Sequence, residues 1–146
     1  MEPQGLPILI SLQSSAAPDG RDAETISLLT AGELFATAGG YMLRYEEAMD
    51  ENSAPTQVEL LLEDHAVTLC RSGDYNVNMV FRKGQRYEGQ YRTPHGSFAL
   101  ALYCTKISYA FDPEDGELHL HYQLNINGQF VAMHKLELYY FVKKTA

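Results

Sequence analysis

The feature that most constrains this chain is an alternation of apolar and polar residues with a period of two, which recurs from one end of the sequence to the other. Because successive side chains of a β-strand point to opposite faces, this period predicts strands with one buried face. Clusters of Gly, Pro, Asn, Asp and Ser separate the alternating runs and predict tight turns. The runs begin at Ile8, Thr25, Tyr41, Val58, Val67, Tyr75, Tyr87, Phe98, Leu118 and Phe130.

No stretch shows a helical period long enough for a crossover helix, so neighbouring strands must be antiparallel. About eight to ten strands joined by short turns form either a sandwich or a barrel, and sequential hairpins favour an up-and-down barrel because closure removes exposed edges. Gly32 is expected to let one long strand bend at a barrel corner. A chain of 146 residues fits one domain, so we expect a single all-β barrel over residues 1–146.

The last hairpin can be registered from its own pattern. A two-residue turn at Asn127-Gly128 would mix the two surfaces, because Leu120 would face Lys135. A three-residue loop over residues 126–128, with Gly128 in the left-handed conformation, keeps one face apolar and is the register we predict. It pairs Leu124 with Phe130, Tyr122 with Ala132, Leu120 with His134, and Leu118 with Leu136.

Five polar side chains interrupt the otherwise apolar inner face that the alternation defines. Arg71, for example, follows Val67 and Leu69 on one strand and shares their face. The full set is Tyr45, Arg71, Tyr91, Tyr122 and His134. The strand pattern alone does not fix the distances among them.

The formal net charge of −8 restricts the partners of the chain. Nucleic acid and anionic membranes attract Lys and Arg, so an acidic chain disfavours both. The N-terminus lacks the basic start of a secretory signal, and no segment is long and apolar enough for a membrane span. Cys70 and Cys104 have no CxxC spacing, which is typical of reduced, partly buried thiols. We therefore expect a cytoplasmic protein.

Several short motifs carry a resemblance to a known family. They are Tyr45-Glu46-Glu47, Arg71 with Gly73, a YxTPxG pattern made by Tyr91, Thr93, Pro94 and Gly96, Thr105, and Tyr122 with Leu124. On these residues the chain resembles the YwiB-like bacterial proteins, a family of unknown function, over most of its length. The resemblance implies a calycin-type barrel, similar to lipocalins and fatty-acid-binding proteins. Calycin relatives imply one default activity, which is to hold a small apolar or amphipathic molecule.

Arg71 is the first candidate ligand-binding residue, because a guanidinium that faces a barrel interior needs a partner. A ligand carboxylate or phosphate is one such partner. The other interpretation places Arg71 at the barrel rim, either paired with Glu46, Glu47 or Glu63 or extended into water. The rarity of fully buried charged residues favours this second interpretation. The resemblance to fatty-acid-binding barrels, which hold a carboxylate with interior Arg and Tyr, points to the first.

Each of the three inward tyrosines has a ligand interpretation and a structural one. The hydroxyls of Tyr45, Tyr91 and Tyr122 could donate to the head group of the same ligand. An inward tyrosine more often supplies core volume, with its hydroxyl bonded to a backbone carbonyl.

The histidines favour structural interpretations. His134 could ligate haem inside a calycin barrel, but no second signature of haem is present, which favours a core histidine. His119 and His121 project from alternate positions of one strand, on the outer face and away from His134, and they lack a third metal ligand. We expect no metal and no cofactor.

One predicted hairpin carries the only local basic cluster, Arg82, Lys83, Arg86 and Arg92. Such a surface could contact RNA or a protein. Acidic segments elsewhere in the chain would repel phosphates, so a solvated hairpin face is favoured and nucleic acid is disfavoured. A homodimer that uses exposed aromatics of the last strand stays open.

No GxSxG, P-loop, GxGxxG or HExxH motif is present, which excludes the enzyme classes that carry such motifs. A convergent active site needs only proximity in space, so catalysis stays open, although the sequence favours none. The preferred function is non-catalytic binding of a small amphipathic or anionic ligand. The alternative is a filled barrel that binds a protein or RNA partner through its outer surface.

Overall fold

The computed structural model describes residues 5–18, 23–47 and 54–143. This part of the chain forms ten strands, β1 (Leu6–Ala17), β2 (Glu24–Thr37), β3 (Gly40–Glu47), β4 (Thr56–Glu63), β5 (Ala66–Ser72), β6 (Val77–Phe81), β7 (Arg86–Thr93), β8 (Gly96–Phe111), β9 (Asp115–Ile126) and β10 (Gln129–Val142). All pairs are antiparallel, in the order β6-β5-β4-β3-β2-β1-β10-β9-β8-β7. The predicted all-β fold of about ten antiparallel strands is confirmed. No described residue belongs to a helix that could cross a membrane.

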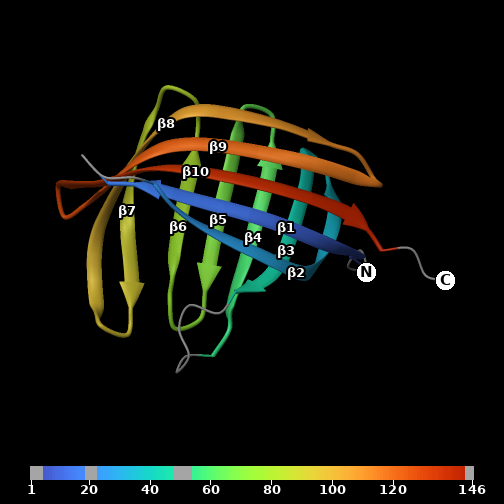
Figure 1. Ribbon diagram of the computed structural model, residues 1–146, viewed down its shortest axis with the longest axis horizontal. Coiled ribbons are helices and arrows are strands. Elements are labelled where there is room, and N and C mark those ends of the chain that lie inside the picture. The colour runs from blue at the N-terminus through green and yellow to red at the C-terminus, as the bar shows by residue number, and fades with distance from the viewer. Residues whose placement is uncertain (1–4, 19–22, 48–53, 144–146) are drawn as a thin grey trace.

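The single sheet wraps into a nearly closed barrel made of two crossed layers. In Figure 1, β9, β10, β1 and β2 run across the view, as does the second half of β8, while β3 to β7 and the first half of β8 run vertically. The two free edges, β6 and β7, meet at one bridge, where Asn76 and Arg92 exchange backbone hydrogen bonds of 2.8 and 2.9 Å. In the described residues these two strands form no other ladder, so the barrel has a seam between them.

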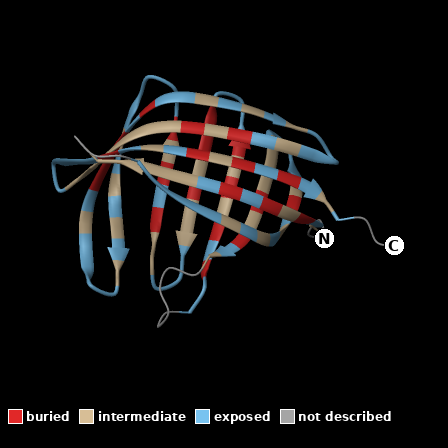
Figure 2. Ribbon diagram, viewed as in Figure 1, coloured by how far each residue is buried: buried red, intermediate tan, exposed pale blue. Residues whose placement is uncertain are grey.

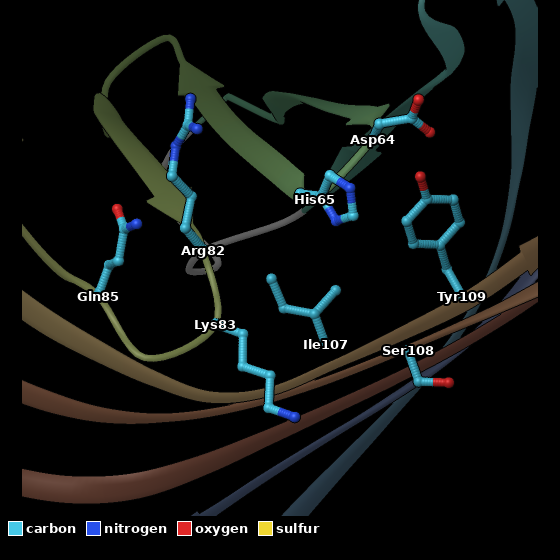
Figure 3. Close-up of a pocket in the computed structure, with 8 residues that line it drawn as sticks. All are labelled: Asp64, His65, Arg82, Lys83, Gln85, Ile107, Ser108 and Tyr109. Atoms are coloured by element: carbon cyan, nitrogen blue, oxygen red, sulfur yellow. The ribbon is translucent and has the colours of Figure 1, made fainter.

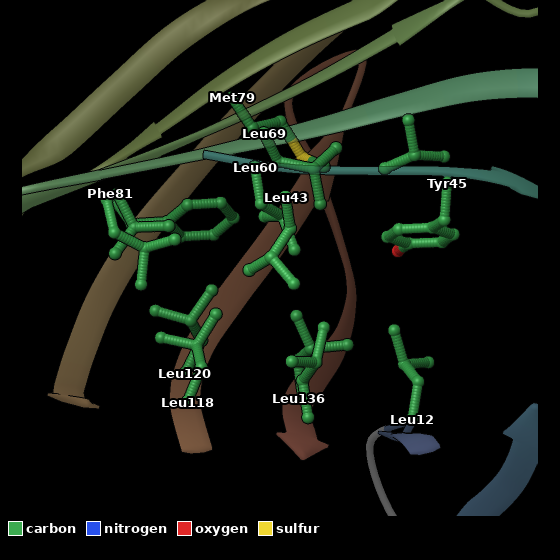
Figure 4. Close-up of a cluster of buried hydrophobic side chains, with 14 of the residues drawn as sticks. Leu12, Leu43, Tyr45, Leu60, Leu69, Met79, Phe81, Leu118, Leu120 and Leu136 are labelled. Atoms are coloured by element: carbon green, nitrogen blue, oxygen red, sulfur yellow. The ribbon is translucent and has the colours of Figure 1, made fainter. Parts of the chain in front are cut away.

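The apolar half of each alternation fills the space between the two layers, and Figure 2 shows the buried residues in bands across the middle of the strands. Figure 4 shows side chains of β3 to β6, such as Leu43 and Leu60, facing Leu118, Leu120 and Leu136 of β9 and β10. Of these five leucines, Leu136 is 9% exposed and the other four have no exposed surface. Burial of one such side chain stabilises the fold by about 1.5–3 kcal/mol. This core holds the two layers together.

The last hairpin differs from the register predicted from the sequence. Asn127 and Gly128, with φ of 51° and 80°, form a two-residue turn, and a bulge between Phe130 and Ala132 then shifts the pairing. The pairs are Leu124 with Ala132, Tyr122 with His134, Leu120 with Leu136, and Leu118 with Leu138. The predicted register is therefore wrong by two residues, because the pattern does not reveal the bulge. A shift of two residues keeps every side chain on the same face of the sheet. Tyr122 and His134 therefore point inward, as predicted.

Two sequence features have local structural roles. The turn between β7 and β8 is held by Thr93, whose Oγ1 accepts a hydrogen bond from His95 N at 3.0 Å and donates one to Gly96 O at 3.1 Å. At Gly32 in β2, a Cβ would lie 2.7 Å from both Arg44 O and the Cδ1 of Ile10. Only glycine allows the backbones of β2 and β3 and the core side chain to approach so closely.

Candidate functional site

The up-and-down order gives the barrel two ends with different contents. One end carries the β2–β3, β4–β5, β6–β7 and β8–β9 turns, and we call it the sealed end. The other carries the connections that follow β1, β3, β5, β7 and β9, and we call it the open end. The polar inner residues predicted from the sequence all lie toward the open end.

Aromatic rings fill the sealed end. Phe111 lies edge-on to Tyr140 with ring centroids 4.8 Å apart, and to Tyr109 at 5.9 Å. The Tyr140 hydroxyl donates to Asp112 O at 2.5 Å, and the Tyr109 hydroxyl donates to Glu63 O at 2.8 Å. These hydroxyls therefore follow the structural interpretation of an inward tyrosine, with a backbone carbonyl as partner.

At the open end, the strand register brings three predicted residues into one row across the β3–β7 layer. Tyr45 pairs with Val58, Val58 with Arg71, and Arg71 with Val77. Tyr91 lies beside Arg92, whose bridge to Asn76 brings it level with this row. Tyr45, Arg71 and Tyr91 thus face the interior side by side.

Tyr122 and His134 face this row from the opposite layer. They pair across β9 and β10, and their rings stack with centroids 5.1 Å apart and planes 8° apart. Tyr122 also reaches the other layer, where its ring lies 4.9 Å from that of Phe81. Burial, and secondarily the charge of Arg71, lowers the pKa of His134 below its usual value of 6.5, so the imidazole is neutral at pH 7.

The charge of Arg71 affects the pKa of each of the other four polar inner residues. Its charge lowers the pKa of Tyr45, Tyr91 and Tyr122, although burial is the larger effect and raises the pKa of all three hydroxyls above 10. Its Nε lies 3.5 Å from Glu47 Oε1, and the side chains are 20% and 19% exposed. The Nε is itself buried and makes no hydrogen bond to any described residue, so the ion pair is poorly aligned.

A cavity of about 370 Å³ opens beside Arg71. Leu12, Leu28, Leu69, Phe81 and Leu136 form much of its apolar wall, and its polar lining includes Ser14, Tyr45, Glu47, Arg71 and Tyr122. Ile26, which is 70% exposed, also lines it. Three of the five predicted ligand-binding residues therefore line one cavity, while Tyr91 and His134 lie outside its lining.

Glu47 is not among the ligand-binding residues predicted from the sequence. It was expected only as one of the rim partners of Arg71. The sequence does indicate that Glu47 points inward. Tyr41, Leu43 and Tyr45 alternate on the inner face of β3, and Glu47 is the next residue in that alternation.

A larger hollow, of about 560 Å³, lies at the sealed end. It is formed by the β4–β5 turn with Asp64 and His65, the β6–β7 turn with Arg82 and Lys83, and part of β8. Figure 3 shows the Arg82 and Lys83 side chains pointing in opposite directions. The two cations therefore do not converge on a common anion.

The four residues of the predicted interaction patch are spread along the β6–β7 hairpin. Arg82 and Lys83 lie in the turn at the sealed end, while Arg92 lies at the open end beside the seam. Arg86 pairs with Glu88 at 3.0 Å on the same strand face. The structure thus interrupts the basic patch with an acidic residue.

The remaining candidates lie apart from the cavity. His121 lies opposite Lys135 in the register of β9 and β10. His119 Nε2 lies 3.8 Å from Glu117 Oε2, and its ring packs against that of Tyr139. Cys70 and Cys104 are free thiols. Among the described residues, no group of three or more His, Cys, Asp or Glu side chains could hold a metal ion.

Comparisons with known proteins agree with this fold. A family model described as domain of unknown function DUF1934 matches residues 10–138. The uncharacterized β-barrel protein YwiB of Bacillus subtilis (strain 168) is 24% identical over 137 residues, which are 94% of each chain. The crystal structure of the ywiB protein from Bacillus subtilis is similar, with a TM-score of 0.86 and 22% identity, over 97% of this chain and 95% of that one.

Proposed function

Because this chain belongs to the DUF1934 family, whose function is unknown, we propose its function from the barrel's own geometry. The protein binds a small amphipathic molecule in the open-end cavity, without transforming it, and Arg71 holds the anionic group of that molecule. The proposal is carried by the buried Arg71 Nε, which lies beside the cavity and has no hydrogen-bond partner in residues 5–18, 23–47 and 54–143. Burying such a donor unpaired is unfavourable, and a ligand oxygen would satisfy it.

The size and lining of the cavity support this function. Its volume of about 370 Å³ lies within the range of about 300–1,000 Å³ that is typical of small-molecule sites. Apolar walls with a few convergent polar groups are the usual composition of such sites. The resemblance to calycin-type barrels, whose members hold small molecules, points to the same function.

The hydroxyls at the open end also support it. In the described part of the chain, no hydrogen bond uses the hydroxyl of Tyr45, Tyr91 or Tyr122, whereas Tyr109 and Tyr140 at the sealed end bond backbone carbonyls. Tyr45 and Tyr122 line the cavity, so their hydroxyls are free to donate to a ligand.

Native mass spectrometry of protein purified from bacteria without denaturation tests the proposal. We expect an extra mass that is lost on denaturation, retained in Arg44→Met and reduced in Arg71→Met. Arg44 is the matched control, because it pairs with Glu59 at 3.6 Å on the outer face. A clean apo mass for all three proteins, with a dimer or a co-purifying protein, would instead favour the outer-surface interaction module.

A further inference from the structure

The open-end cavity contains two opposite charges that are not well satisfied by each other. Arg71 and Glu47 both line it, and their closest approach, 3.5 Å, gives no hydrogen bond to the buried Nε. Each side chain is only about one-fifth exposed, at 20% and 19%. An ion pair removed from water in this way, without good hydrogen-bond geometry, is a weak source of stability.

The remaining groups around the pair are neutral at pH 7. Tyr45, Tyr91 and Tyr122 stay protonated, and His134 stays unprotonated, as their burial requires. Among the described residues that line the cavity, Arg71 is the one positive side chain and Glu47 the one negative side chain. Together they contribute no net charge.

These two opposite charges favour some ligand charges over others. A simple anion on Arg71 would lie next to the Glu47 carboxylate, and a simple cation on Glu47 would lie next to the guanidinium. In a partly buried site, such like-charge contacts are weakly screened and unfavourable. A head group with both charges can pair with both residues and leaves the cavity neutral.

An aromatic ring favours the cationic half. Tyr45 lines the same cavity as Glu47, whereas one face of the Tyr122 ring is stacked on His134. The face of a tyrosine ring attracts an ammonium group. The apolar remainder of the ligand would contact the leucine and phenylalanine side chains that form much of the other lining.

We propose that the occupant of this cavity is a zwitterionic amphiphile, whose anionic group pairs with Arg71 and whose ammonium group pairs with Glu47. This assignment rests on the proposed function and names the chemical class of its ligand. An α-amino acid with an unbranched apolar side chain is the simplest member of the class.

Isothermal titration calorimetry with three probes of one chain length tests it: octanoate, octylammonium and 2-aminooctanoate. On the wild-type chain we expect 2-aminooctanoate to bind about tenfold more tightly than either other probe, the difference expected for one additional charge-assisted hydrogen bond. In Glu47→Gln this advantage should disappear, and octanoate should bind more tightly than it does to the wild type. Glu46→Gln is the matched control, because Glu46 is the exposed neighbour that bonds Gln57 at 3.0 Å.

Two results would overturn the assignment. One is octanoate binding to the wild type as tightly as 2-aminooctanoate does, and this comparison needs no variant. The other is an unchanged preference in Glu47→Gln whose melting temperature matches the wild type. If octanoate then loses affinity in Arg71→Met, the proposed function survives without the zwitterion. If none of the three probes binds, both proposals fail.

Discussion

Both ends of this barrel contain inward tyrosines, but in the described residues only the tyrosine hydroxyls at the sealed end make hydrogen bonds. At the sealed end, the hydroxyls of Tyr109 and Tyr140 donate to carbonyls in hairpin turns, and the rings pack on Phe111. At the open end, the buried Arg71 Nε and the buried Thr56 Oγ1 have no hydrogen-bond partner among the described residues. Buried polar groups therefore have protein partners at one end, whereas several lack them, within the described chain, at the other.

The backbone of β9 shows that the aromatic packing at the sealed end has a structural role. At Gly116 in β9, a Cβ would overlap the Tyr140 ring, so the ring packs directly on the backbone. Arg71 instead lines the open-end cavity and another hollow of about 410 Å³ beside the β6–β7 seam. The difference leads us to expect stability effects at the sealed end and binding effects at the open end.

The largest expected effect is loss of the aromatic packing at the sealed end. Tyr140→Ala should lower the free energy of unfolding by about 3–5 kcal/mol, as for other buried aromatic residues. Tyr139→Ala, at the neighbouring outward position that is 42% exposed, should cost less than about 1 kcal/mol. Urea unfolding of both variants measures this. Equal losses would show that the sealed end has no special structural role.

The ion pair between Arg71 and Glu47 should not be needed for the stability of the fold. Replacing both residues, as Arg71→Met with Glu47→Leu, should raise the free energy of unfolding by about 1–4 kcal/mol, because apolar side chains of similar size avoid the desolvation of two charges. The same pair of changes at Arg44 and Glu59, which are 41% and 39% exposed, should change it by less than about 1 kcal/mol. A strong destabilisation by the inner double variant would mean that the pair serves the fold.

Hydroxyl removal compares the two ends more finely. Tyr140→Phe deletes the hydrogen bond to Asp112 O and should cost about 0.5–1.5 kcal/mol of unfolding free energy. Tyr122→Phe deletes no hydrogen bond within the described residues and should leave that free energy nearly unchanged. Thermal melting of the two variants at equal concentration is sufficient. A larger loss for Tyr122→Phe would contradict the contrast between the ends.

The smallest expected effect is a pH dependence from His134. Burial lowers its pKa in the folded chain, so the unfolded chain binds its proton more readily. Its contribution to stability is present above pH 6.5 and declines as the pH falls through the lowered folded pKa. His134→Asn should flatten this part of a stability profile measured between pH 4 and 8. Parallel profiles for the wild type and His134→Asn would remove His134 as a source.

The sequence predicts faces of strands well and distances poorly. Inward positions of Tyr45 and Arg71 follow from the period of two alone, because the period determines which side each residue takes. The register of the last hairpin could not be predicted, since a bulge depends on packing across strands that the pattern does not encode. The β6–β7 seam, and hence the meeting of Arg71 with the opposite layer, depends on how the whole sheet closes.

Nuclear magnetic resonance of arginine Nε–H groups shows whether Arg71 Nε binds the anionic group of a ligand. Addition of octanoate or 2-aminooctanoate should shift the Nε–H resonance that is missing in Arg71→Met and leave that of Arg44 in place. If the Arg71 resonance stays unmoved by both probes at saturating concentration, Arg71 does not hold an anion and the account of the open end is wrong.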